Sequence, residues 1–280
     1  MSILNTQNIR RLTLTTPIAA ALAALAAGAV NAEAKTEAGA SAPKPTIVLV
    51  HGAWADGSGW NRVIDRLRDD GYPVRAAPNP LRGLNVDSAV VRGFLQSITG
   101  PKIVVGHSYG GAVISEAAEG LPDVKGLVYI TAFAPDTGES VGQLAAMPVA
   151  HPIPELPTVT VNATLPDGTT DTEFYLDPAK FQARFAADVP NDVAADLAAT
   201  QRGTALATLT DTLTGTPAWK TIPSWYLVAR QDMALAPDLA RFFAKRAQSH
   251  TSESNGSHAV FISHPDAVVK TIEAAATATR

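Results

Sequence analysis

The chain has 280 residues, of which 46% are hydrophobic and 17% charged, and its formal net charge is -4. These values suit a folded domain with a sizeable core and argue against general disorder. They exclude nucleic-acid binding through a strongly basic surface, and the absence of cysteine excludes disulfides and thiolate metal sites.

The first 34 residues differ from the rest of the chain. Arg10 and Arg11 precede an uncharged, alanine-rich stretch over residues 12–30, and small residues follow it. A basic start, an apolar middle and a small-residue end are typical of a secretory signal peptide. We therefore expect residues 1–34 to be a cleaved signal peptide rather than a membrane anchor, and residues 35–45 to be a polar linker. The mature protein would then be periplasmic or secreted, without a stable membrane anchor.

From residue 46 onward, short apolar runs alternate with amphipathic segments. The apolar runs predict strands at 46–50, 72–79, 102–106, 124–132 and 223–229. The amphipathic segments predict helices at 60–71, 86–98, 111–120, 237–247 and 265–278. Buried strands that alternate with helices indicate an α/β fold, with a mostly parallel sheet of about six strands and helices on both faces.

One long segment, residues 136–221, interrupts this alternation. It is rich in Pro, Thr, Asp and Ala, and it contains helical patterns at 177–188 and 191–201. An interruption of this length far exceeds an ordinary connection between elements. The sequence therefore predicts a core made of residues 46–135 and 222–280, with a helical cap inserted between its two parts.

A serine stands between the third predicted strand and the helix that follows it. Gly106, Ser108 and Gly110 fit the pattern G-x-S-x-G. In this pattern a sharp strand-to-helix turn raises the serine hydroxyl above the C-terminal edge of the sheet, and the glycines leave room for the turn. The pentapeptide alone is a modest signal that chance also produces. Its position between a strand and a helix predicts that Ser108 is a nucleophile.

A serine hydroxyl is a poor nucleophile at neutral pH and needs a neighbouring base. Sites of this kind have the usual chain order serine, acid, histidine. His258 stands in a loop of small residues just before the final helix, and we predict it to be the base. His250 and His264 are less suitable, because one precedes a turn and the other adjoins a proline at the helix entry.

The base needs an acid that orients its ring. Asp232 follows directly after the predicted strand at 223–229, on the sheet edge where the serine is expected, and we predict it to be this acid. Asp238 stands at a helix start and Asp211 lies within the insert, so neither has this placement.

Acyl transfer also needs two backbone N–H donors for the developing oxyanion. Tyr109, which follows the serine, is predicted to supply one, and Ala53 in the loop after the first strand the other. Trp54 in that loop, with Trp219 and Phe181 in the insert, are predicted to contact the substrate, although such aromatic residues more often belong to the core. We expect neither a metal nor a cofactor, because the sequence has no H-E-x-x-H pattern and no cluster of His and Asp.

Four stretches together resemble the α/β-hydrolase superfamily, and within it the branch of small esterases and hydroxynitrile lyases. They are IVLVHGAWADGSGW, VVGHSYGG, WYLVARQD and GSHAVFISHP. The resemblance covers about residues 46–275 and implies the α/β-hydrolase fold without its two usual first strands. Lyases of this branch carry a threonine and a lysine where this chain has Gly52 and Ala259, so the resemblance implies ester hydrolysis. A signal peptide is unlike the plant members and suits an exported bacterial protein.

The resulting hypothesis is a serine hydrolase that cleaves a small carboxylic ester through an acyl-enzyme intermediate. Its partner would be a small-molecule ester, with no nucleic acid. Cofactor-free perhydrolysis, haloperoxidase-like chemistry and lactone hydrolysis use the same groups and stay open as alternatives. A further alternative, from a different class, is a non-catalytic protein of this fold that binds a small molecule.

Overall fold

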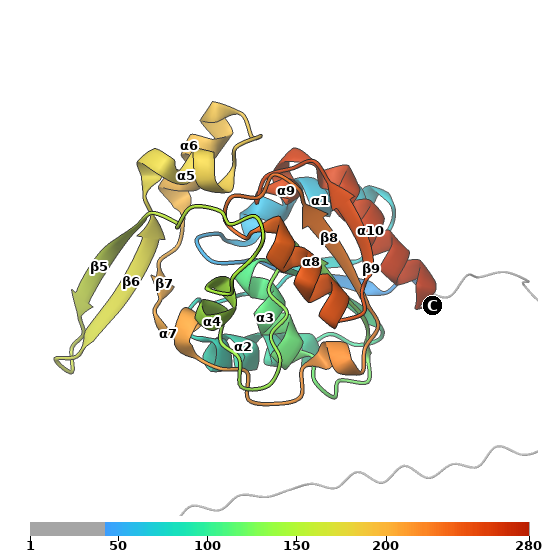
Figure 1. Ribbon diagram of the computed structural model, residues 1–280. Coiled ribbons are helices and arrows are strands. Elements are labelled where there is room, and N and C mark those ends of the chain that lie inside the picture. The colour runs from blue at the N-terminus through green and yellow to red at the C-terminus, as the bar shows by residue number, and fades with distance from the viewer. Residues whose placement is uncertain (1–42, 280) are drawn as a thin grey trace, which may run out of the picture. The chain divides into compact units, whose positions relative to one another are not determined.

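A parallel sheet of six strands, in the order β2-β1-β3-β4-β8-β9, forms the centre of the computed structural model, which describes residues 43–279 (Figure 1). The strands are β1 (Thr46–Val50), β2 (Val74–Ala76), β3 (Lys102–His107), β4 (Val124–Ile130), β8 (Ser224–Ala229) and β9 (His250–Ser254). Every neighbouring pair runs parallel, as strands joined by helices must. The predicted α/β fold is confirmed.

The chain reverses its direction across the sheet at β1. The second strand lies on one side of β1, and the third strand lies on the other side. At such a reversal the loops after the two central strands diverge and leave a crevice outside their C-terminal ends. The fold therefore places the loop after β1 beside Ser108, which follows β3.

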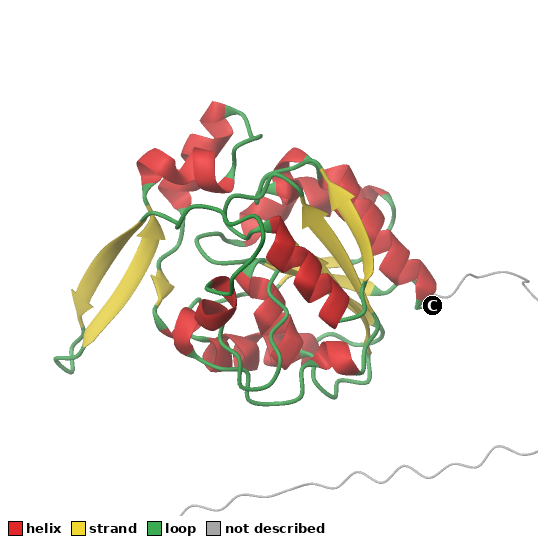
Figure 2. Ribbon diagram, viewed as in Figure 1, coloured by secondary structure: helices red, strands yellow, loops and turns green. Residues whose placement is uncertain are grey.

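Helices cover both faces of the sheet (Figure 2). One face packs against α2 (Leu84–Gln96), α3 (Tyr109–Ala117) and α8 (Pro237–Arg246). The other face packs against η1 (Gly57–Trp60), α1 (Asn61–Asp69), α9 (Val260–Ser263) and α10 (Pro265–Ala278). Because alternate residues of a strand point to opposite faces, Val48 and Val104 belong to one hydrophobic core, and Ile47 and Ile103 to the other.

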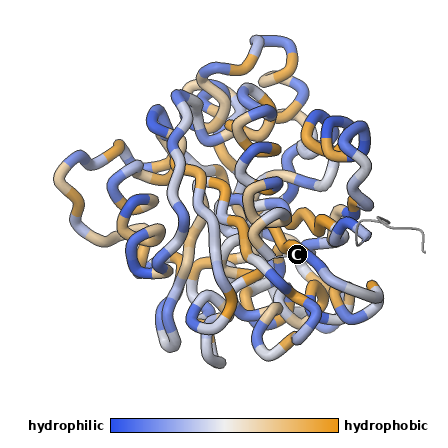
Figure 3. Tube along the Cα trace, turned by 90° about the vertical axis from the view of Figure 1, so that its right-hand side faces the viewer, coloured by the Kyte–Doolittle hydropathy of each residue, from blue (hydrophilic) through white to orange (hydrophobic). Residues whose placement is uncertain are grey.

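The strands at the centre and at the edge of the sheet differ in character. All six residues of β3 are buried, which explains the apolar run at its centre, residues 103–105. The edge strand β9 has four exposed residues followed by one buried residue, and its sequence, HTSES, was not predicted as a strand. In Figure 3 the hydrophobic stretches of the trace gather in the middle of the molecule.

The insert between β4 and β8 contains both helices and an antiparallel sheet. Its helices are α4 (Val141–Ala145), α5 (Pro178–Phe185), α6 (Asn191–Thr200), α7 (Ala207–Thr210) and η2 (Ala218–Lys220). Its strands are β5 (Thr158–Thr164), β6 (Thr170–Leu176) and β7 (Thr204–Ala205), in the order β5-β6-β7. Both predicted helices of the insert are present as α5 and α6. The expectation of a helical cap is incomplete, because β5, which begins with alternating Thr and Val, and β6 form a hairpin around an Asp-Gly turn.

The core and the insert, within the described residues 43–279, belong to one compact unit. The predicted signal peptide and most of the predicted linker lie outside the described residues. Within residues 43–279, no helix has the length and apolar character needed to cross a bilayer.

Candidate active site

Ser108 lies at the turn between β3 and α3, with φ 51° and ψ -124°. This is a conformation that side-chain-bearing residues rarely adopt. A Cβ atom on Gly106 would lie 2.5 Å from the carbonyl oxygen of Gly110, and a Cβ atom on Gly110 would lie 2.6 Å from that of Val50. Only glycine fits at both positions. A Cβ atom on Gly52 would lie 2.7 Å from that of Ser108, so the loop after β1 packs directly against the serine.

Three of the five described non-glycine residues with a positive φ lie at this edge of the sheet. Trp54 in the loop after β1, Ser108 after β3 and Thr131 after β4 have φ values of 57°, 51° and 40°. A positive φ is most costly for a β-branched residue such as Thr131. Strained residues of this kind cluster at functional sites, where the surrounding structure holds them in place. The strain therefore marks the C-terminal edge of the central strands as the candidate site.

His258 and Asp232 form a buried pair at the same edge. His258 follows β9 and Asp232 follows β8. The Nδ1 atom of His258 lies 2.6 Å from Oδ2 of Asp232, and the two side chains are 1% and 0% exposed. A carboxylate oxygen accepts the hydrogen bond, so Nδ1 carries the proton. In the neutral ring, Nε2 on the opposite side is then left as a proton acceptor.

Both oxygens of the Asp232 carboxylate have further partners. Oδ1 accepts hydrogen bonds from the N–H groups of Ala234 at 2.7 Å and Leu235 at 2.8 Å. Oδ2 accepts one from the Thr131 hydroxyl at 2.5 Å. These bonds compensate for burial of the carboxylate and fix its orientation toward His258. Sequence analysis missed Thr131, which falls inside the strand predicted at 124–132.

His107, which precedes the serine, is a second residue that sequence analysis missed. Its side chain is fully buried, and its Nε2–H donates to the carbonyl oxygen of His258 at 3.0 Å. Burial, and to a smaller extent the charge of His258, lowers the pKa of His107 well below its usual value, so its ring stays neutral. The two imidazole rings lie 4.6 Å apart. His107 thereby ties the loop that carries the candidate base to the end of β3.

The backbone N–H groups of Tyr109 and Ala53 are available as donors. Tyr109 is the first residue of α3, where an N–H group has no acceptor within the helix. Within residues 43–279, neither N–H group donates a hydrogen bond. The loop that carries Ala53 is held in place by the side-chain amide of Asn79, which donates to the carbonyl oxygen of His51 at 2.8 Å.

Trp54 connects this loop to the insert. Its backbone N–H donates to the Thr204 hydroxyl at 3.3 Å, and its indole N–H donates to the carbonyl oxygen of Phe174 at 3.2 Å. Trp54 and Phe181 both line a cavity of only about 20 Å³, which has room for about one water molecule. The ring of Phe185, which also lines it, lies 4.9 Å from the ring of His258. Phe185 thus packs against His258, and Phe181 packs against Phe185.

A larger cavity of about 100 Å³ is lined by apolar residues, two of which form hydrogen bonds with Ser108 and Asp232. Phe133, which lines it, donates its N–H to the carbonyl oxygen of Ser108 at 3.1 Å. Leu235, also in the lining, is one of the two N–H donors to Asp232. The remaining lining residues are Ala145, Met147, Val149, Pro152, Ile153, Ala234, Ala236 and Leu239.

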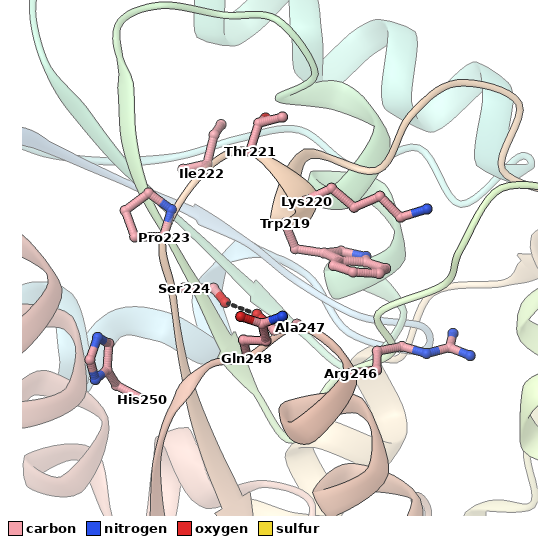
Figure 4. A pocket seen from close by; sticks show the side chains of 10 residues that line it. All are labelled: Trp219, Lys220, Thr221, Ile222, Pro223, Ser224, Arg246, Ala247, Gln248 and His250. Atoms are coloured by element: carbon pink, nitrogen blue, oxygen red, sulfur yellow. Dashed lines mark hydrogen bonds between the residues drawn. The ribbon is translucent and has the colours of Figure 1, made fainter.

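Trp219 lies away from these residues. It lines a groove of about 350 Å³ together with Ser224 and His250, the first residues of β8 and β9 (Figure 4). Asp232 and His258 follow the C-terminal ends of the same two strands. The groove therefore lies at the N-terminal ends of the strands, on the opposite side of the sheet from Ser108. The indole N–H of Trp219 donates to the carbonyl oxygen of Pro135 at 3.0 Å. The prediction that Trp219 contacts a substrate at Ser108 is therefore wrong. Trp219 lies at the other end of the strands, where its hydrogen bond to Pro135 ties the end of the insert to the segment after β4.

These groups are of the kinds that acyl transfer uses. They are a serine hydroxyl at a strained turn, a histidine oriented by a buried carboxylate, and two N–H groups without acceptors. In the part of the chain that the structure describes, no three His, Asp or Glu side chains are grouped to hold a metal ion.

The fold and this arrangement define the α/β-hydrolase class. A model of the alpha/beta hydrolase family matches residues 47–271, and the chain belongs to that family. The resemblance seen in the sequence is thus confirmed for family and fold.

Particular relatives agree with this assignment. The chain is 33% identical to a carbendazim hydrolyzing esterase of a Nocardioides species over 118 residues, which are 38% of this chain and 48% of that esterase. The match thus spans about half the length of that relative. The alpha/beta hydrolase nvfD of Aspergillus novofumigatus is 30% identical over 259 residues, covering 83% of this chain and 97% of nvfD. The crystal structure of polyneuridine aldehyde esterase is similar in fold, with a TM-score of 0.67 and 16% identity over 82% of this chain and 98% of that one.

Proposed function

We propose that this protein hydrolyses small carboxylic esters through an acyl-enzyme intermediate on Ser108. The observation that carries the proposal is the buried contact of 2.6 Å between His258 and Asp232, at the sheet edge that also holds the strained turn at Ser108. Similarity to a named esterase supports the same class of reaction.

In the proposed reaction, the Ser108 hydroxyl attacks the ester carbonyl while Nε2 of His258 accepts its proton. The tetrahedral intermediate collapses when His258 passes this proton to the departing alcohol, which leaves the acyl group on Ser108. Water, deprotonated by His258, then attacks the acyl group and restores the serine. Asp232 keeps the proton of His258 on Nδ1 and stabilises the imidazolium that forms in each half-reaction.

The N–H groups of Tyr109 and Ala53 are proposed to bind the oxyanion of the tetrahedral intermediate. In other enzymes, loss of one such donor costs about 3 to 4 kcal/mol of transition-state stabilisation. The nine-residue helix α3 adds a favourable field, because its N-terminus lies directly after Ser108.

The apolar cavity beside Phe133 and Leu235 is the proposed site for the hydrocarbon part of the ester. Its volume is about 100 Å³, whereas an engineered apolar cavity of about 150 Å³ accepts benzene. We therefore expect short alkyl groups, smaller than a benzene ring, to bind best.

Labelling of the purified protein with a fluorophosphonate tests the nucleophile, with Ser108→Ala as the control. We expect the label on Ser108, located by peptide mass mapping, and its absence in the variant. A panel of p-nitrophenyl esters should then show faster turnover of acetate and butyrate than of octanoate. A label without ester turnover would direct the search to lactones and peracid formation. Absence of the label from a folded protein would overturn the mechanism and favour a non-catalytic binding protein.

A further inference from the structure

The hairpin of β5 and β6, residues 158–176, projects from the rest of the insert (Figures 1 and 2) and is called the arm below. Every residue of β5 is exposed. Three large apolar side chains of the arm are unusually accessible: Val159 is 44% exposed, Val161 49% and Leu165 41%. In the described part of the chain, β5 pairs only with β6. Its other edge therefore presents backbone N–H and C=O groups that suit another strand.

The strand β5, TVTVNAT, lacks the features that prevent edge strands from pairing. It contains no charged residue and no proline, and its register with β6 continues through all seven residues without a bulge. The acidic residues of β6 do not generate strong repulsion, because Asp171 and Glu173 lie 3.2 Å and 2.6 Å from Arg82. An exposed, regular and uncharged edge of this kind is a liability unless something covers it.

We propose that two copies of this protein form a symmetric dimer in which their β5 strands pair antiparallel about Val161. In this register Val161 lies opposite its own copy, and Val159 lies opposite Ala163 of the partner subunit. Thr160 lies opposite Asn162 of the partner subunit. The pairing matches apolar residues with apolar residues and polar residues with polar residues, and it brings no like charges together. This self-complementarity favours a second copy as the occupant of the edge.

In the resulting sheet, one face of the paired β5 strands is apolar and the other is polar. Odd-numbered residues of β5 share one face, so Val159, Val161 and Ala163 of both copies form one apolar strip. The threonine and asparagine side chains line the other face, where they can form cross-strand hydrogen bonds. The three strands of each copy then join into one antiparallel sheet that leaves neither β5 edge free.

The same register also covers the tip of the arm. Leu165, just beyond β5, would lie opposite Pro157 of the partner subunit, at the base of the partner's arm. A strand of seven residues spans about 24 Å, so the tip of each arm reaches the base of the other. The exposed side chain of Leu165 would thereby gain an apolar contact.

Single cysteines test the register directly, because the chain has no cysteine of its own. Val161→Cys places two sulfur atoms opposite each other, whereas Val159→Cys separates them by about 14 Å along the strands, beyond the reach of a disulfide. Under mild oxidation we expect Val161→Cys to form a covalent dimer on a non-reducing gel and Val159→Cys to stay uncoupled. Failure of both variants to couple, or coupling of Val159→Cys instead, overturns the proposal.

Sedimentation velocity tests the dimer without cross-linking. Val161→Lys places two like charges opposite each other and should yield monomers, whereas the wild type should sediment as a dimer. The matched control is Val86→Lys, because Val86 is 51% exposed and lies on α2, away from the arm; it should remain dimeric. Melting temperatures of both variants report whether they are folded. A monomeric wild type at all concentrations, or a folded Val161→Lys dimer, contradicts the proposal.

Discussion

The C-terminal edge of the central sheet and the arm of the insert differ in how far their polar groups are buried and hydrogen-bonded. At the sheet edge, Asp232 has four hydrogen bonds to its two carboxylate oxygens and is almost fully buried. On the arm, the whole of β5 is exposed, and one edge of its backbone has no partner among the described residues. The first region is complete within one chain, whereas the second has a clear physical role only if another chain covers it.

This difference shows where substitutions should be costly. A buried polar group that loses its hydrogen-bond partner still carries the full free-energy cost of its burial. An exposed polar group can form a hydrogen bond with water instead. Changes at the sheet edge should therefore reduce activity and stability sharply, and comparable changes at exposed positions should be mild.

The largest expected effect is that of Asp232→Asn. The asparagine side chain cannot hold His258 in the required tautomer, and we expect kcat to fall by about 10⁴-fold, as for the equivalent change in a serine protease. Initial rates on the preferred p-nitrophenyl ester measure this. The matched control is Asp238→Asn, since Asp238 lies at the start of α8 and contacts the exposed His151. Equal activities of the two variants would remove Asp232 from the mechanism.

Substitution of glycines should separate the two regions by stability. A Cβ atom at position 110 meets the backbone oxygen of Val50 at 2.6 Å, and we expect Gly110→Ala to lower the free energy of unfolding by about 3 kcal/mol. Gly168 in the turn of the arm has φ 83° and nothing within 4 Å of an added Cβ. Gly168→Ala should cost only the strain of a left-handed alanine, about 1 kcal/mol. Urea unfolding measures the free energy of unfolding of both variants. A larger loss for Gly168→Ala than for Gly110→Ala would contradict the prediction.

A moderate effect is expected at His107. His107→Phe keeps an aromatic ring but leaves the carbonyl oxygen of His258 without its donor. We expect kcat to fall about tenfold, which corresponds to about 1.4 kcal/mol, with little change in KM. His107→Gln restores an N–H donor and should recover part of the lost rate. If the two variants lose the same activity, the hydrogen bond does not position His258.

The smallest effect concerns a contact between the insert and the core. Burial alone would raise the pKa of Glu139, but its hydrogen bonds with Arg246 of α8 and with the backbone N–H of Asp136 together outweigh burial and hold that pKa below its usual value. The folded state therefore favours the charged carboxylate. This stabilisation is present above the unfolded pKa, about 4.5, and is lost as the pH falls through the lower folded pKa. The melting temperature of Glu139→Gln should be lower than that of the wild type at neutral pH, and the gap should close in acid. A gap independent of pH would contradict this.

The sheet, and the position of Ser108, Asp232 and His258 after the C-terminal ends of its strands, could be predicted because short-range signals mark them. The apolar sequence of β3 reflects burial on both faces, and the glycines around Ser108 reflect contacts that no side chain fits. Thr131 and His107 were missed because their roles depend on partners 101 and 151 residues away in the sequence. Local patterns do not carry such information.

Exposed strands of both the core and the insert were less predictable for a different reason. Strand β9 and strand β5 lie at sheet edges and are largely exposed, so burial does not impose an apolar pattern on them. The Thr and Val alternation of β5 and the turn at Asp167 and Gly168 were nevertheless usable signals for a hairpin. Trp219 was misplaced because its sequence neighbourhood does not show which end of the sheet it reaches.

The two hydrogen bonds of Trp54 have a consequence for protein engineering. The hydroxyl of Thr204 and the carbonyl oxygen of Phe174, both from the insert, hold the loop that contains Ala53. The insert is therefore not a module that can be exchanged freely for one with another specificity. A chimaera would need a hydroxyl and a carbonyl acceptor at the same two places. A donor segment without them would change the geometry of the loop as well as the shape of the cavity.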